Sequence, residues 1–91
     1  MKKQVQNSSW KITQTSANGV EKRGEPPYEY WGGAVATPHG YVEVFSQKDW
    51  TALNFAHQGR MHRRSIRREY TKRGLAILAG RFAKEIVEVG A

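Results

Sequence analysis

The chain contains no cysteine, only three prolines and no long run of apolar residues. Without a thiol, disulfide bonds, thiolate zinc sites and cysteine nucleophiles are excluded. No stretch approaches the roughly 20 apolar residues of a membrane span, and the basic start Met1-Lys2-Lys3 lacks the apolar run of a signal peptide. We therefore expect a cytoplasmic protein with no membrane association.

Acidic side chains are also scarce. Eight Asp and Glu residues stand against fifteen Lys and Arg residues, so the formal net charge is +7 in a chain of 91 residues. Such a surplus favours an anionic partner, namely nucleic acid, a ribonucleoprotein or an acidic protein complex. The alternative is that the charge serves solubility alone.

The remaining composition is that of a folded protein. Hydrophobic residues make up 38% of the chain and aromatic residues 11%, which is typical of a globular domain and not of a disordered tail. We expect the polar residues 1–8 to form a flexible N-terminus. Residues 9–91 then form a single domain.

The first half of the chain predicts β-strands. Residues 9–15 alternate between apolar and polar side chains, which indicates a first strand. Residues 20–27 are rich in charge and include Pro26-Pro27, so we expect a mobile loop there. Residues 28–46 predict a β-hairpin, in which Gly32-Gly33 marks a bulge or a close backbone approach.

A second hairpin is predicted downstream. Residues 50–57 and 60–67 form its two strands, and Gly59 lies in the turn between them. A helix over residues 51–70 is the rival interpretation. We favour the hairpin because a glycine in the middle weakens a helix and the apolar residues do not form one stripe at helical spacing.

The C-terminal segment predicts an amphipathic helix. Its apolar residues recur at steps of three and four: Leu75, Leu78, Ala79, Phe82, Ile86 and Val89. Thr71 is suited to cap the N-terminus, and Gly90 to end the helix. The apolar stripe has to pack on the sheet. The predicted fold is therefore α+β, an antiparallel β-sheet of four to five strands packed against one C-terminal α-helix.

Positive charge gathers in residues 59–73, called the basic segment below. Seven of the fifteen Lys and Arg residues lie there beside one acid: Arg60, Arg63, Arg64, Arg67, Arg68, Lys72 and Arg73. The planar guanidinium of arginine holds phosphate or carboxylate with two hydrogen bonds. We predict that the basic segment binds an anionic partner. The alternative is an edge strand that its charge protects from aggregation.

Alternation along a strand divides the basic segment between two faces. Arg60, His62 and Arg64 point one way, whereas Arg63 and Arg67 point the other. An edge strand at 60–67 also offers a pairing surface for a homodimer. At the helix start, Lys72 and Arg73 repel the positive end of the helix dipole, which a bound anion would relieve.

Aromatic residues supply a second set of candidate contacts. Tyr28, Tyr30 and Trp31 lie beside the predicted loop, with Tyr41 in the next strand, and we consider them for stacking on unpaired bases or for anchoring a partner protein. The alternative is that they belong to the core. We assign three other aromatic residues to the core: Trp10, Phe45 and Phe55.

Evidence for catalysis is weak. His39, His57 and His62 are the candidates for acid–base chemistry near neutral pH. His57 and His62 would face each other across the second hairpin, with Arg64 nearby, as in a ribonuclease. No ligand set has the spacing of a metal site, and no phosphate-binding loop or nucleophile motif occurs. We expect no catalytic activity, no cofactor and no metal.

Residues 40–60, 68–75 and 81–86 resemble small accessory proteins encoded by bacteriophages and prophages, the anti-CRISPR proteins among them. The resemblance includes no catalytic motif. It implies a protein of the bacterial host cytoplasm that docks on a host machine and blocks it. A basic member of this kind would hold guide RNA or an acidic protein surface.

These observations predict a small basic, non-catalytic binding protein. It docks through its Arg-rich surface on nucleic acid or a ribonucleoprotein, as a phage-encoded inhibitor of a host defence complex. A second hypothesis is a transcriptional regulator that inserts a basic β-ribbon into a DNA groove. A small ribonuclease is the third.

Overall fold

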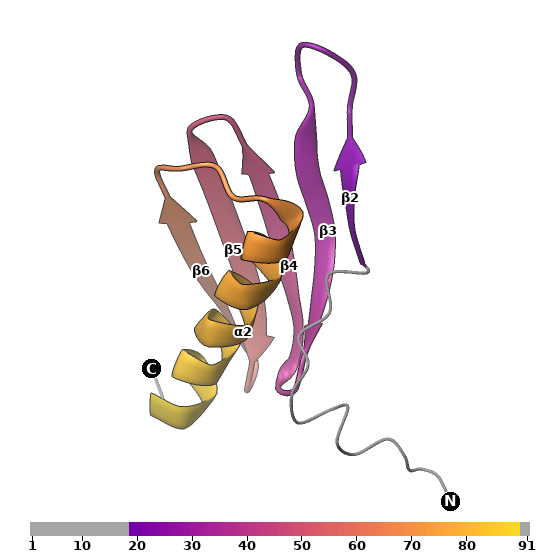
Figure 1. Ribbon diagram of the computed structural model, residues 1–91. Coiled ribbons are helices and arrows are strands. Elements are labelled where there is room, and N and C mark those ends of the chain that lie inside the picture. The colour runs from indigo at the N-terminus through magenta and orange to yellow at the C-terminus, as the bar shows by residue number, and fades with distance from the viewer. Residues whose placement is uncertain (1–18, 90–91) are drawn as a thin grey trace, which may run out of the picture.

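The computed structural model describes residues 19–89 and contains one antiparallel sheet and one helix (Figure 1). The strands are β2 (Val20–Arg23), β3 (Tyr30–Thr37), β4 (Gly40–Gln47), β5 (Trp50–His57) and β6 (Arg60–Ile66), and they neighbour one another in chain order. Helix α2 (Lys72–Val89) follows. The predicted α+β class, with four to five strands and a C-terminal helix, is confirmed. The predictions for residues 1–8 and for a strand at 9–15 lie outside the described residues.

Both predicted hairpins form, and the rival helix over residues 51–70 is wrong. In the turn between β5 and β6, Gln58 and Gly59 have φ values of 50° and 76°. Positive values at both central positions match the twist of the flanking strands. Asp49 also has a positive φ, of 75°, in the turn between β4 and β5. Three short connections therefore join β3 to β6 as a meander.

The prediction of a loop over residues 20–27 is wrong at its start. Val20–Arg23 form β2, which pairs with β3 from Val20 opposite Gly33 to Arg23 opposite Tyr30. The two prolines lie beyond the strand and remove no hydrogen bond from it. Gly33 has a φ of 140°, and a Cβ there would collide with the carbonyl of Gly19. The glycine pair thus permits the close backbone approach that the sequence suggested.

The core lies between α2 and one face of the sheet. From the sheet it takes Val20, Val35, Val42, Val44, Leu53 and Phe55. The helix contributes Leu75, Ala76, Ala79, Phe82, Ala83 and Ile86. Three alanines on this face let the helix approach the sheet closely. Two members of the predicted stripe differ, since Leu78 is only partly buried and Val89 is exposed. Helical periodicity identifies the apolar face of a helix, but it does not show how much of that face the sheet covers.

Phe45 does not belong to this core, contrary to prediction. Val44 and Ser46, its neighbours in β4, are buried under α2, so alternation directs Phe45 to the other side of the sheet. Figure 1 shows the helix on only one side. Within residues 19–89 no element covers the opposite side, which is called the open face below. Trp10, also predicted for the core, lies outside this range.

Candidate binding surface

The connection between β6 and α2, residues 67–71, is attached to the sheet by a chain of hydrogen bonds. The Tyr70 amide donates to Ser46 Oγ at 2.8 Å, and Thr51 Oγ1 donates to the Arg68 carbonyl at 2.7 Å. The two hydroxyls lie 2.6 Å apart. Since the Thr51 proton is used on Arg68, Ser46 donates to Thr51. Ser46 and Thr51 are fully buried, and they hold the backbone of the basic connection in one position.

The same connection starts the helix. The amide of Gly74 donates to Thr71 Oγ1 at 3.0 Å, and the amide of Leu75 donates to the Thr71 carbonyl at 2.8 Å. Thr71 is therefore the N-cap that the sequence predicts. Lys72 and Arg73 stand in the first turn, with no acidic residue beside them in that turn.

Arg64 has a structural role that the sequence did not reveal. Its guanidinium donates two hydrogen bonds to Glu85 of α2, at 3.0 and 3.1 Å, and lies 4.8 Å from the ring centre of Phe82. The hydrogen bond and the positive charge of Arg64 lower the pKa of Glu85 below its ordinary value of 4.5. Arg64 thus connects the edge strand to the helix across 21 positions of sequence.

The other cations of the basic segment divide among three places. Arg60 lies opposite His57 on the helix side of the sheet, and Arg63 lies opposite Asn54 on the open face. The predicted alternation is confirmed here. The remaining four stand in the connection and the first helical turn: Arg67, Arg68, Lys72 and Arg73. The basic segment is therefore not one surface, because alternation and the change from strand to helix separate its side chains.

Within residues 19–89 the only ion pair joins Arg64 to Glu85. The six other cations of the basic segment thus have no carboxylate partner in the described part of the chain. Arg68 stacks on Tyr70, its guanidinium carbon 4.7 Å from the ring centre. Strand β6 stands at an edge of the described sheet, as predicted. Pairing of this edge with a second copy stays a prediction.

The histidines do not form the predicted facing pair. In the register of β5 and β6, His57 lies opposite Arg60 and His62 lies opposite Phe55. The ring of His57 stacks on Phe55 with centres 5.9 Å apart. His39 stands in the turn between β3 and β4, where its amide donates to Thr37 Oγ1. His57 and His62 are therefore diagonal neighbours on the helix side of the sheet and not a directly facing pair.

The three aromatic candidates in residues 28–31 are also separated. Tyr28 stands in the connection between β2 and β3 and is 80% exposed. Trp31 faces the helix side, packs against the core and has Lys22 Nζ 4.5 Å from its ring centre. Tyr30 points to the open face. Only Tyr30 of these three belongs to the surface that the structure leaves uncovered.

Two aromatic residues that the sequence did not assign to a binding surface join Tyr30 on the open face. Phe45 stacks on Tyr30 with ring centres 4.6 Å apart, and Trp50 lies tilted against Phe45 at 5.2 Å. We call these three residues the aromatic cluster. Alternation in the sequence indicated that Trp50 and Phe45 lie on the opposite side of the sheet from Leu53 and Val44, but not which side is covered.

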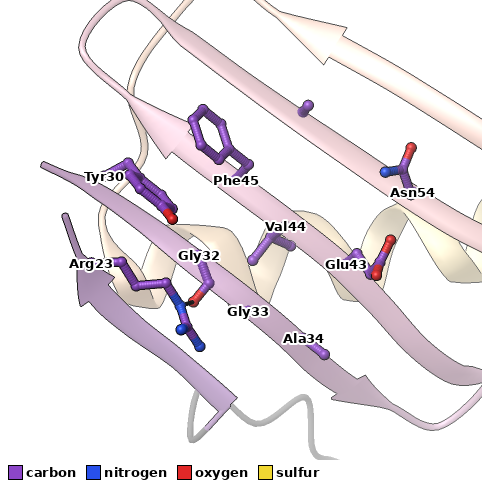
Figure 2. A pocket seen from close by; sticks show the side chains of 10 residues that line it. Arg23, Tyr30, Gly32, Gly33, Ala34, Glu43, Val44, Phe45 and Asn54 are labelled. Atoms are coloured by element: carbon purple, nitrogen blue, oxygen red, sulfur yellow. Dashed lines mark hydrogen bonds between the residues drawn. The ribbon is translucent and has the colours of Figure 1, made fainter. Parts of the chain in front are cut away.

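A shallow hollow of about 520 Å³ lies beside the aromatic cluster. Its small floor residues are Gly32, Ala34 and Ala52. Figure 2 shows Tyr30, Phe45, Glu43 and Asn54 on one side of the sheet, with the helix ribbon behind it. Arg23 closes one end, where its Nε donates to the Gly32 carbonyl at 3.2 Å. Glu43 and Asn54 are cross-strand partners.

Other kinds of site find no support in the described range. Residues 19–89 contain no group of three or more His, Asp or Glu side chains placed to hold a metal ion. Helix α2, the one helix of that range, is not apolar enough over its length to cross a membrane. Comparisons with protein-family models, curated proteins and solved structures find no match to this chain.

Proposed function

We propose that this is a small non-catalytic binding protein that docks on nucleic acid, free or within a ribonucleoprotein, through the part of its basic segment that forms the connection and the first turn of α2. The observation that carries the proposal is the ion pairing and the placement of the six cations of the basic segment other than Arg64. They have no ion pair within residues 19–89, and four of them stand together in the connection and the first turn of α2. Cations without carboxylate partners are available to phosphates.

The connection is also held in place before any partner binds. Ser46 and Thr51 fix the backbone at Arg68 and Tyr70 through hydrogen bonds of 2.6 to 2.8 Å. Less backbone freedom is then lost on binding, which favours affinity. A phosphate near this end of α2 would also offset the repulsion between Lys72, Arg73 and the helix dipole.

The test is neutralisation of two cations with a matched control. Arg67→Gln with Arg68→Gln removes two charges from the connection, whereas Arg81→Gln with Lys84→Gln removes two exposed charges from α2. We expect the first variant to bind a fluorescent 20-nucleotide RNA about tenfold more weakly, and its log-affinity against log-salt slope to fall by about two. The control should bind within about twofold of the parent protein.

Equal weakening of both variants would show attraction by net charge alone and would contradict the proposed site. Circular dichroism of both proteins checks that each is folded. If affinity differs about a thousandfold among duplex sequences, a DNA-binding regulator replaces the proposed function.

The resemblance to phage accessory proteins supports one biological setting for this binding, the block of a host defence ribonucleoprotein. The tagged protein would be purified from bacterial lysate with and without nuclease. A defined guide-RNA complex that survives nuclease and is lost with Arg67→Gln and Arg68→Gln is the expected result. Recovery of bulk, nuclease-sensitive nucleic acid only would contradict this setting.

A further inference from the structure

The open face carries side chains that a purely structural sheet surface does not need. Three of the large exposed apolar residues lie on it: Tyr41, Trp50 and Met61, with exposed fractions of 70%, 38% and 52%. The strand register places them there, since Trp50 pairs with Gln47, and Met61 with Ala56, all out of phase with the buried positions. A contiguous apolar group on an uncovered sheet face indicates a binding surface, and Trp50 with Phe45 and Tyr30 forms such a group.

The layout of the face suits a flat ligand with a polar edge. The aromatic cluster stands at the end where β4 turns into β5, and the hollow over Gly32 and Ala52 opens next to it. Beyond the hollow a polar row crosses three strands, with Glu43 opposite Asn54 and Asn54 opposite Arg63. Amide, carboxylate and guanidinium groups are those that hydrogen-bond the edges of bases.

The open face adjoins the basic connection at its aromatic end. Ile66 lies opposite Thr51, which directly follows Trp50, so the chain enters the basic connection at Arg67 beside the aromatic cluster. A nucleic-acid strand whose phosphates contact the connection would therefore place its bases next to the aromatic rings. One bound strand would therefore contact the charged site with its phosphates and the aromatic rings with its bases.

We infer that the open face is a stacking platform for unpaired bases, so that the nucleic-acid partner is single-stranded. This inference rests on the proposed function. In a duplex the flat faces of the bases are covered by their neighbours, whereas unpaired bases stack on aromatic side chains of sheet surfaces. Trp50 is the most exposed ring of the cluster and supplies the main stacking contact. Arg63 and Asn54 contact the base edges.

A second copy is a less suitable occupant of this face. Packing two such sheets together would bury Glu21, Arg23, Glu43 and Arg63, which the register places on the open side. Of these, Arg23 has a hydrogen bond to the Gly32 carbonyl, and none has an ion pair within the described residues. Burying charge without a partner is unfavourable. A solvent-exposed surface on which bases stack leaves these charged side chains hydrated.

The test compares Trp50→Ala with Ile77→Ala, which changes an exposed apolar residue of α2 on the other side of the sheet. Fluorescence anisotropy measures binding of a 12-nucleotide poly(U) strand and of a 12-base-pair duplex. We expect Trp50→Ala to weaken binding of the single strand about tenfold or more and to leave duplex binding within about twofold. Ile77→Ala should change neither. Trp50→Phe keeps an aromatic ring and should restore most of the single-strand affinity.

The outcomes separate the inference from the proposed function. Unchanged poly(U) binding by Trp50→Ala, together with weak binding by Arg67→Gln and Arg68→Gln, would overturn the stacking platform and leave the basic site standing. Unchanged binding by all variants would overturn both. Light scattering tests the remaining occupant, since a dimer of the parent protein that dissociates in Trp50→Ala would assign the face to a second copy. Circular dichroism of Trp50→Ala and Trp50→Phe checks that both variants are folded.

Discussion

The two faces of the sheet are built from the same five strands and differ in what they bury. Beneath α2 the strands present the branched side chains Val35, Val42, Val44 and Leu53, all buried. On the open face they present small residues at 32, 34 and 52 beside the aromatic cluster and a row of polar groups. Both faces are apolar in part. What separates them is whether the apolar groups have a partner within the described chain, because only the covered ones contribute fully to stability.

The largest expected effect is on stability, and it compares two phenylalanines that lie on opposite faces of the sheet. Phe55→Ala removes a ring that is 2% exposed and should lower the free energy of unfolding by about 3–5 kcal/mol. Phe45→Ala removes a half-buried ring and should cost about 1 kcal/mol. Urea denaturation measures both. If the two costs were equal, the open face would be a structural surface, and the distinction between the faces would fail.

The next largest effect tests the hydrogen bonds that join the sheet face beneath α2 to residues 67–71. Thr51→Val leaves the Arg68 carbonyl without its hydroxyl donor, and Ser46→Ala leaves the Tyr70 amide without an acceptor. Each should destabilise the protein by about 1–3 kcal/mol. Because the hydroxyls belong to one chain of bonds, the double variant should cost less than the sum. Exactly additive costs in thermal and urea unfolding would contradict this coupling.

The smallest effect concerns the ion pair between Arg64 and Glu85, at the edge of the sheet face beneath α2. Arg64 lowers the pKa of Glu85, so the folded protein holds the carboxylate more strongly than the unfolded chain does. The resulting stability is fully present above the ordinary pKa of 4.5 and is lost as the pH falls through the lower folded value. The difference in unfolding free energy between the parent protein and Glu85→Gln should therefore be constant at neutral pH and shrink in acid. A difference that grows below pH 4.5 would contradict the pair.

Much of the fold was predictable because its signals are local. The glycine at 59 and the alternation in β5 and β6 identified the second hairpin, and Thr71 with the spacing of apolar residues identified α2. Strand β2 was missed because the prolines that follow it dominated the interpretation of its surroundings. The binding surfaces were less predictable. Arg64 looked like its neighbours in sequence, and only the arrival of Glu85 from α2 distinguishes it from them.

The sequence by itself determined the charge, the strand alternation and the apolar stripe of the helix, since each depends on residue type and spacing. Tertiary structure alone decided which face of the sheet α2 covers. In β4 the apolar residues Val42, Val44 and Phe45 occur in both phases, so alternation could not choose between the faces. The choice depends on the chain's return through residues 67–71, where Ser46 and Thr51 bind its backbone. That return buries the aliphatic phase and leaves the aromatic one uncovered by any element of residues 19–89.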